Sequence, residues 1–138
     1  MRRSTEKSLT TLRRSRWEME KSGSLKMVEA IVRKEKFPDI DNVLKEIGVS
    51  GLTFFDVEGR GRAKGVEMIS GRGAATYHPE YVEKTKLEIL IKDSEVQKVV
   101  TAIAKAAKTG EIGDGKILVF SVEEAWDIAT GGSGSSAV

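Results

Sequence analysis

A short glycine-rich segment, TGEIGDGK at residues 109–116, carries residue types that could hold a phosphate group. Its glycines would let backbone N–H groups approach an anion closely, and Lys116 would add a compact positive charge. The same pattern, taken alone, is more often a tight connection between a helix and a strand. The segment is therefore a candidate phosphate site, and the rest of the chain must decide between the two interpretations.

Other kinds of chemistry have little support in the composition. The chain has no cysteine, which excludes disulfides, zinc–thiolate sites and thiol nucleophiles. His78 is the only histidine, and a lone histidine without ligands at suitable spacing predicts no metal site. No pairing of a nucleophile with a base is apparent, so we expect a protein that is not an enzyme. A cysteine-free chain also fits the reducing cytoplasm, which is the expected location.

The charge of the chain is unevenly distributed. The 138 residues are the usual length of one domain and carry a net charge of +2. Residues 1–24 contain seven Lys or Arg and three Glu, whereas the remainder is mildly acidic. We expect a basic, disordered extension over 1–24 rather than a nucleic-acid-binding arm, and a flexible Gly/Ser-rich tail over 131–138. The longest apolar stretches are far shorter than the roughly 20 residues that cross a bilayer.

Hydrophobic periodicity divides the middle of the chain into alternating strands and helices. Residues 26–33 alternate with a period of two, whereas apolar residues from Phe37 onward recur at helical spacing until Gly48. Residues 59–80 contain five glycines and no sustained period, which indicates a long loop of the kind that is usually functional or disordered. The expected elements are strands at 26–33, 52–58, 85–91 and 117–122, and helices at 37–47, from Asp93 or Ser94 to Gly110, and at 122–128.

This order of elements predicts an α+β fold, namely a ferredoxin-like double βαβ sandwich with an antiparallel sheet. Helices cover only one face of such a sheet. Apolar side chains nevertheless occur on both sides of the expected strands, as Val28 and Ile31 illustrate. The uncovered face should therefore pack against other copies of the chain, and we expect a homo-oligomer.

Four separated blocks, in the same order along the chain, resemble the PII family of nitrogen-signalling proteins. Residues 109–116 are similar to the family's second signature, in which Thr, three residues and Gly-Asp-Gly-Lys-Ile precede an aromatic residue; Leu118 stands in place of the aromatic. Residues 26–33, 51–62 and 84–89 are similar to three further blocks. The resemblance assigns residues 25–130 to one PII-like domain, with the family's mobile T-loop at about 59–80.

The resemblance implies a homotrimer that binds ATP or ADP, with AMP as a further candidate, in the clefts between subunits. Thr53 and Leu90 would contact the base. The residues that would surround the ribose and phosphates are Gly59, Gly61, Arg62, Lys64, Gly113, Asp114, Gly115 and Lys116. Arg33, Gly65 and Lys84 fall where the family handles the γ-phosphate or the effector 2-oxoglutarate. The T-loop would then regulate a partner such as an ammonium transporter or a metabolic enzyme.

Three departures from the family pattern bear on which ligands this chain senses. Ala63 replaces a glutamine that helps to hold the magnesium ion between ATP and 2-oxoglutarate, so a 2-oxoglutarate response is doubtful and the role of magnesium stays open. Asp127 and Ala129 replace two arginines that reach the phosphates, which favours ADP or AMP relative to ATP. An alternative function is therefore an ADP or AMP sensor without a 2-oxoglutarate response that regulates carbon or other metabolism.

Tyr77 falls where many bacterial relatives carry a modified tyrosine. Its neighbours, in the sequence ATYHP, differ from the familiar modification sequence. An unmodified loop tyrosine is therefore favoured, with modification as the alternative.

A third and less favoured function is that of a trimeric structural or metal-handling protein of similar fold.

Overall fold

The computed structural model describes residues 24–62, 68–70, 75–77 and 80–138, the two short stretches by their backbone only. Apart from Ser24, the extension expected over residues 1–24 lies outside the described residues. The disorder predicted for that extension accordingly stays a prediction.

Four strands form one antiparallel sheet: β1 (Leu25–Arg33), β2 (Thr53–Gly59), β5 (Val82–Lys92) and β6 (Gly115–Val122). Their order is β2-β5-β1-β6, and every neighbouring pair is antiparallel. β1 and β2 therefore run parallel with β5 between them, and β5 and β6 run parallel with β1 between them. These are two interlocked split βαβ units, which confirms the predicted α+β fold and its antiparallel sheet.

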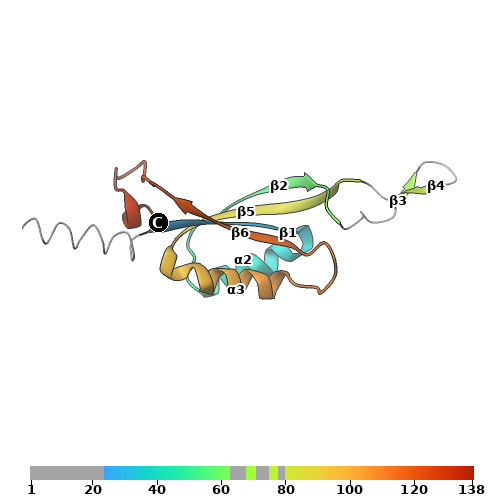
Figure 1. Cartoon of the computed structure of the whole chain (residues 1–138), viewed down its shortest axis with the longest axis horizontal. Helices are drawn as coiled ribbons and strands as arrows, with labels where there is room; N and C mark the ends of the chain where they lie inside the picture. The colour runs from blue at the N-terminus through green and yellow to red at the C-terminus, as the bar shows by residue number, and fades with distance from the viewer. Residues whose placement is uncertain (1–23, 63–67, 71–74, 78–79) are drawn as a thin grey trace, which may run out of the picture.

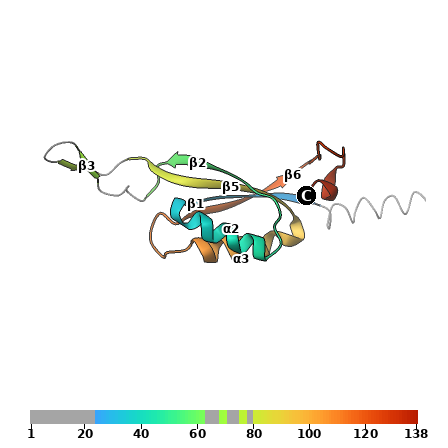
Figure 2. The same ribbon diagram turned by 180° about the vertical axis from the view of Figure 1, so that it is seen from behind.

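Two helices, α2 (Phe37–Glu46) and α3 (Val96–Ala107), lie on the same face of the sheet in both ribbon views (Figures 1 and 2). A single 3-10 turn precedes each helix: η1 (Lys34–Lys36) and η2 (Asp93–Glu95). The helix expected to start at Asp93 or Ser94 begins at Val96, because both residues lie in the preceding 3-10 turn, and neither caps the helix with its side chain. Gly48 follows α2 with a φ of +91°, a left-handed conformation that ends helices and favours glycine.

The core lies between the helices and the sheet. Alternate residues of β1 and β5 point into it, and two residues of α2 and three of α3 meet them. The buried apolar residues of this cluster are Val28, Ala30, Val32, Ile40, Leu44, Leu87, Ile89, Ile91, Val99, Ile103 and Ala107. Each larger side chain among them contributes about 1.5–3 kcal/mol relative to an exposed position, so the patterns that predicted strands and helices also supply the stability.

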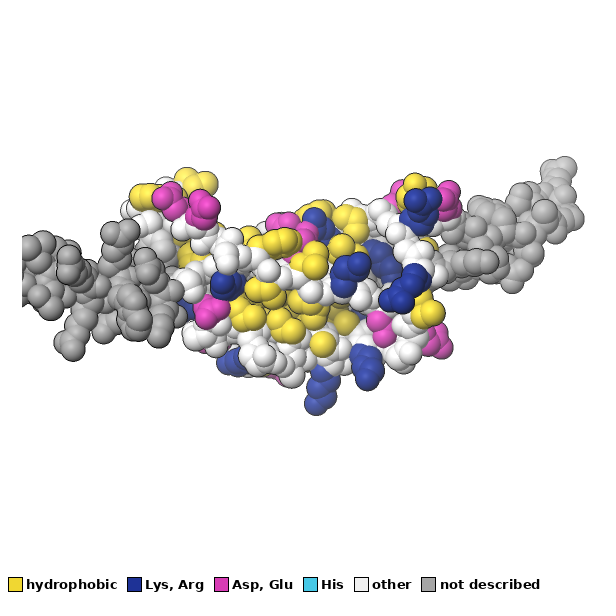
Figure 3. Space-filling view, in the orientation of Figure 1, with side chains coloured by type: hydrophobic (Ala, Val, Ile, Leu, Met, Phe, Trp, Pro, Cys, Tyr) yellow, Lys and Arg dark blue, Asp and Glu magenta, His cyan; other side chains and the backbone are white. Residues whose placement is uncertain are grey.

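The opposite sheet face has no helix over it, and β6 forms the edge of the sheet. Leu118 and Phe120 of β6 lie on this face and are 38% and 47% exposed, whereas Val119, which pairs with the core residue Val28, is 44% exposed on the helix side of the edge. Figure 3 shows hydrophobic side chains gathered along this edge. On the uncovered face Glu29 is buried and pairs with Lys86, so its charge is compensated. A face of this composition fits the expected contact with other copies, and the oligomer stays a prediction.

The segment expected as a loop over residues 59–80 contains two short strands, β3 (Met68–Ser70) and β4 (Ala75–Tyr77), which pair antiparallel. Figure 1 shows this hairpin beyond the ends of β2 and β5, at the opposite end of the molecule from the C-terminus. The sequence analysis missed both strands, because three residues are too few for a period-two pattern to stand out among glycines.

The helix predicted over residues 122–128 is wrong. Asp127 instead closes a turn: its side-chain Oδ1 accepts a hydrogen bond from the Thr130 N–H at 2.9 Å, and its carbonyl accepts one from the Gly131 N–H at 2.9 Å. Such local bonds from Asp, together with nearby glycines, compete with helix formation. Trp126, which lies in the same segment, is 64% exposed. The chain then forms η3 (Gly134–Ala137), and the predicted flexibility of 131–138 is untested.

Candidate functional site

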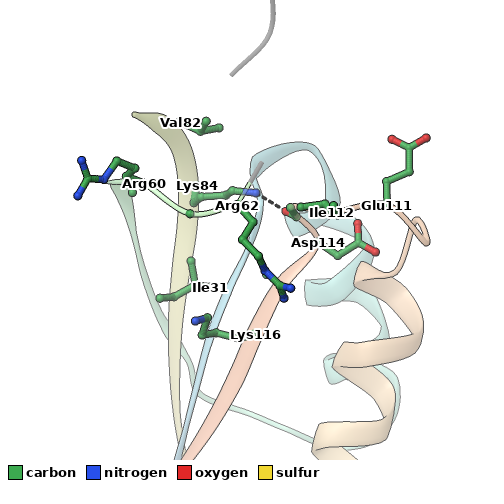
Figure 4. Close-up of a pocket in the computed structure, with 13 residues that line it drawn as sticks. Ile31, Arg60, Arg62, Val82, Lys84, Glu111, Ile112, Asp114 and Lys116 are labelled. Carbon is green, nitrogen blue, oxygen red and sulfur yellow. Dashed lines mark hydrogen bonds between the residues drawn. The ribbon is translucent and has the colours of Figure 1, made fainter. Parts of the chain in front are cut away.

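A cavity of about 450 Å³ lies where the end of β2 and the start of β5 meet the loop between α3 and β6. Its walls combine cationic side chains, glycine backbone and three apolar side chains (Figure 4). The residues that line it are Ile31, Gly59, Arg60, Gly61, Arg62, Val82, Lys84, Glu111, Ile112, Gly113, Asp114, Gly115 and Lys116.

Glycine is required at Gly115 for steric reasons. Its φ is +105°, and a Cβ atom there would lie 1.7 Å from the Ile31 carbonyl oxygen of the neighbouring strand. Gly113 has the same left-handed φ of +105°. Two of the glycines that suggested a phosphate site are thus needed for the helix-to-strand turn itself, so the two interpretations of residues 109–116 are compatible.

Asp114 holds this loop in shape. Its carboxylate accepts hydrogen bonds from the Thr109 N–H at 2.8 Å, from the Gly110 N–H at 2.9 Å and from the Thr109 hydroxyl. The Arg33 Nε donates to the same carboxylate at 3.0 Å. These donors, above all the Thr109 hydroxyl, hold the pKa of Asp114 well below its usual range. The carboxylate therefore stays ionised at neutral pH and is occupied by its own loop.

The cations of the cavity differ in how far they are already engaged. Lys84 donates to the Gly113 carbonyl, and burial, reinforced by the nearby Arg33 guanidinium, lowers its pKa. Arg60 points away from the cavity in Figure 4 and pairs with Glu80 at 2.6 Å. Arg62 points across the cavity toward Lys116 and Asp114, and both cations are exposed. Arg62 and Lys116 are thus placed to contact an anion, and they would form their strongest hydrogen bonds with a phosphate or a carboxylate.

A second cavity of about 570 Å³ lies at the other end of the sheet, where β2 begins. Thr53 and Leu90 line it together with Glu88 and Glu95, and no Lys or Arg belongs to its described lining. Ala137 and Val138 of the C-terminal segment line it as well. Gly59 is six positions after Thr53 in β2, which corresponds to roughly 20 Å of extended strand. The two cavities therefore occupy opposite ends of one strand.

The structure brings together most of the predicted site residues and separates two. One cavity holds Gly59, Gly61, Arg62, Lys84 and residues 113–116. Thr53 and Leu90 line the second cavity instead. Arg33 contacts Asp114 without lining either cavity. Lys64, Gly65 and Ala63 lie outside the described residues, and the backbone of Tyr77 lies in β4 while its side chain is not described.

The sequence analysis missed Ile31, Val82, Glu111 and Ile112 as lining residues. Strand pairing accounts for the first two, because Ile31 is the partner of Lys116 and Val82 is the partner of Gly59. Only the correct register would have identified them, and no local motif contains them. Glu111 and Ile112 lie inside the glycine-rich segment and were visible as its intervening residues.

Within the described parts of the chain, no group of three or more His, Cys, Asp or Glu side chains is arranged to hold a metal ion. No described helix is long and apolar enough to cross a membrane. The arrangement is a glycine-rich turn beside two exposed cations, which is suited to bind an anion.

Comparison with protein families matches residues 25–132 to the family "Nitrogen regulatory protein P-II". The chain is 44% identical over 115 residues to "Nitrogen regulatory protein P-II 2" of Methanothermobacter thermautotrophicus, covering 83% of this chain and 97% of that protein. It is 41% identical over 115 residues to the P-II protein of Rhodospirillum rubrum, covering 83% of this chain and all of the relative.

Solved structures of P-II proteins are also similar to this chain. Arabidopsis thaliana PII bound to citrate superimposes with a TM-score of 0.69 at 34% identity, over 84% of this chain and 94% of that one. The Bacillus subtilis GlnK–ATP complex gives a TM-score of 0.69 at 32% identity, over 85% and 98% of the two chains. The matched family and the curated relatives are nitrogen regulatory proteins. The chain belongs to the P-II family of nitrogen regulatory signalling proteins.

Proposed function

We propose that this P-II protein binds an adenine nucleotide, with the phosphates in the cavity between the end of β2 and the loop 109–116. The observation that carries the proposal is the convergence of Arg62, Lys84 and Lys116 on one glycine-rich turn. A phosphate chain concentrates negative charge, and such a turn with adjacent cations is suited to hold it. The ATP complex of the GlnK relative supports the same class of ligand.

A complete nucleotide site requires two copies of the chain. The base and the phosphates of a nucleotide are joined by a single ribose, whereas Thr53 and Lys116 belong to cavities at opposite ends of β2. The acidic second cavity repels phosphate but can accept hydrogen bonds from the amino group of a base. We infer that the phosphate cavity of one subunit faces the Thr53 cavity of the next.

A cyclic homotrimer satisfies this arrangement. The same two surfaces can meet at every interface of a ring, so each subunit contributes one phosphate half and one base half. The uncovered sheet face and the exposed apolar residues of β6 supply surface for the contact. Burying such a face would remove an apolar patch that soluble monomers seldom expose.

The phosphate end should discriminate little between ATP and ADP. Asp127 and Ala129 stand where two arginines are expected to reach the phosphates, and Asp127 is engaged in its own turn. Its pKa is lowered, chiefly by the hydrogen bond from the Thr130 backbone, so it remains negative at neutral pH. This observation favours the second candidate function, an ADP or AMP sensor without a 2-oxoglutarate response. The Arabidopsis relative is bound to citrate, which supports a carboxylate ligand as another candidate anion for this chain.

The output of the sensor is proposed to be the segment 59–80, which connects directly to the phosphate cavity through Gly59, Gly61 and Arg62. A ligand that engages Arg62 would bias the conformation of the adjoining segment. Its hairpin projects beyond the sheet, as a partner-binding element would (Figure 1). The partner class is an ammonium transporter or an enzyme of nitrogen or carbon metabolism, and Tyr77 remains a candidate modification site.

Calorimetry tests this function directly. Titrations with ATP, ADP and AMP, each with and without magnesium and 2-oxoglutarate, should show nucleotide binding with little change on adding 2-oxoglutarate. The absence of binding by all three nucleotides at millimolar concentration would reject the proposed function. A strong magnesium-dependent gain with 2-oxoglutarate would reject only the part of the proposal that concerns Ala63.

A further inference from the structure

Arg33 forms a two-point contact that ties the loop 109–116 to the sheet. It is the last residue of β1, and its Nε donates to Asp114 Oδ1 at 3.0 Å while its Nη2 donates to the Ile112 carbonyl at 3.1 Å. The side chain is only 23% exposed and does not line the phosphate cavity. Two of its donor atoms are therefore already engaged by the loop, and Arg33 itself contributes no wall to the cavity.

We propose that Arg33 is a positioning residue, which fixes the loop in the shape that receives the phosphates, rather than a direct ligand of the γ-phosphate or of 2-oxoglutarate. The inference rests on the proposed nucleotide site and assigns a different role to a residue within it.

The remaining contacts of Asp114 explain why this tie matters. Its other hydrogen bonds come from Thr109 and Gly110, which belong to the same loop and cannot fix the loop relative to the sheet. Lys84 of β5 provides a second tie, because it donates to the Gly113 carbonyl. Two cations from two strands thus hold successive carbonyls, those of Ile112 and Gly113.

A glycine-rich loop loses more conformational freedom on ordering than other sequences do. If the protein orders the loop in advance, a ligand does not have to, and its affinity is higher. The planar guanidinium suits this task, because it can direct two N–H groups at two fixed acceptors at once. Lysine at the same position would keep the charge but lose the planar pair of N–H groups.

The two roles predict different patterns of loss when ATP and ADP are titrated without 2-oxoglutarate. Removal of a direct ligand of the γ-phosphate lowers the affinity for ATP and leaves the affinity for ADP unchanged. Removal of a residue that holds the loop lowers the affinity for both nucleotides by the same factor. We expect Arg33→Gln to lower the affinities for ATP and for ADP by roughly ten-fold each, because charge-assisted hydrogen bonds to the loop are lost. Arg33→Lys should weaken both by a smaller, equal factor.

Lys34→Gln is the matched control. Lys34 is the adjacent cation and pairs with Asp56 and Glu83, not with the loop. Its removal deletes the same charge at the same end of the sheet, so affinities within about two-fold of the unmodified protein are expected. Equal losses in Lys34→Gln and Arg33→Gln would show that long-range charge alone is responsible and would overturn the proposal.

Hydrogen exchange of the ligand-free protein supplies a readout that does not depend on nucleotide. Arg33→Gln should accelerate exchange of the Thr109 and Gly110 amides, which bond Asp114, while the core amides of β1 and β5 and the oligomeric state by light scattering stay unchanged. Unaltered loop exchange, or a loss confined to ATP, would overturn the positioning role. If no nucleotide binds the unmodified protein, the proposed function fails, and the exchange data still decide whether Arg33 orders the loop.

Discussion

The two cavities at the ends of β2 differ in the charge of the side chains that line them. The cavity at Gly59 is lined by Arg62, Lys84 and Lys116 and is bounded by a loop that Asp114 and Arg33 hold in place. The cavity at Thr53 carries Glu88 and Glu95 and is lined in part by the last two residues of the chain. One strand thus has a cavity lined by several cations at one end and an acidic cavity at the other. The contrast indicates that a single chain offers two different halves of a site.

The largest expected difference between the two ends is steric. Gly115→Ala should lower the free energy of unfolding by at least about 2–4 kcal/mol, because a left-handed alanine is strained and its Cβ would collide with the Ile31 carbonyl. Gly51→Ala, beside the second cavity, should change it by less than about 1 kcal/mol, because no atom lies within 4 Å of the added Cβ and φ is not positive. Urea denaturation compares the two variants, and equal stabilities would contradict the account.

The next contrast concerns charge. Lys116→Ala should lower the affinities for ATP and ADP by about 10- to 100-fold, because one charge-assisted contact with a phosphate is lost. Lys105→Ala removes an exposed lysine of α3 that lines neither cavity, so it is the control and should leave affinity unchanged. Isothermal titration calorimetry makes the measurement. Retention of full affinity in Lys116→Ala would move the phosphates elsewhere.

A smaller gain is expected from restoring a magnesium ligand at the phosphate end. Ala63→Gln adds an amide oxygen that could orient a cation between nucleotide and 2-oxoglutarate, whose negative charges otherwise repel. Calorimetry with Mg-ATP should then show a 2-oxoglutarate response that is weak or absent in the unmodified chain. Equal responses in both chains would show that another group orients the metal.

The smallest effect is the pH dependence of the loop. The pKa of Asp114 is lower in the folded state than in the unfolded chain, so its ionised form stabilises the fold at pH values above the ordinary range of aspartate. That contribution is lost only as pH falls through the native pKa. A carbon-13 NMR titration should therefore show the Asp114 carboxyl titrating well below free aspartate, with unchanged loop amides from pH 7 to 5. Titration near the usual value would show that the hydrogen bonds to the carboxylate are not maintained in solution.

Much of the fold was predictable because its elements obey simple periods. The alternation of β1 and the helical spacing from Phe37 match the buried positions of the structure. The C-terminal helix failed for an equally local reason, because Asp127 and the glycines after it favour a turn over the helix suggested by the apolar residues.

The site was harder to predict than the fold. The motif at 109–116 predicted a candidate phosphate loop, and that assignment stays a prediction; the contact of this loop with Arg33 joins residues 81 positions apart. The separation of Thr53 from the phosphate cavity depends on strand register, since Thr53 pairs with Glu88 while Gly59 pairs with Val82. Short motifs contain neither relation, because both arise only when β1, β2 and β5 align in one sheet.

The central claim, that one site is built from two subunits, can be tested by mixing defective chains. Lys116→Ala damages the phosphate half, and Thr53→Tyr fills the base half, so neither variant alone should bind nucleotide well. After the two variants are unfolded and refolded together in equal amounts, about one quarter of the sites in a cyclic trimer should combine an intact Lys116 with an intact Thr53 of the neighbouring subunit. The account predicts that calorimetry recovers this fraction of sites at nearly the original affinity. Mixed chains that bind no better than the separate variants would contradict it.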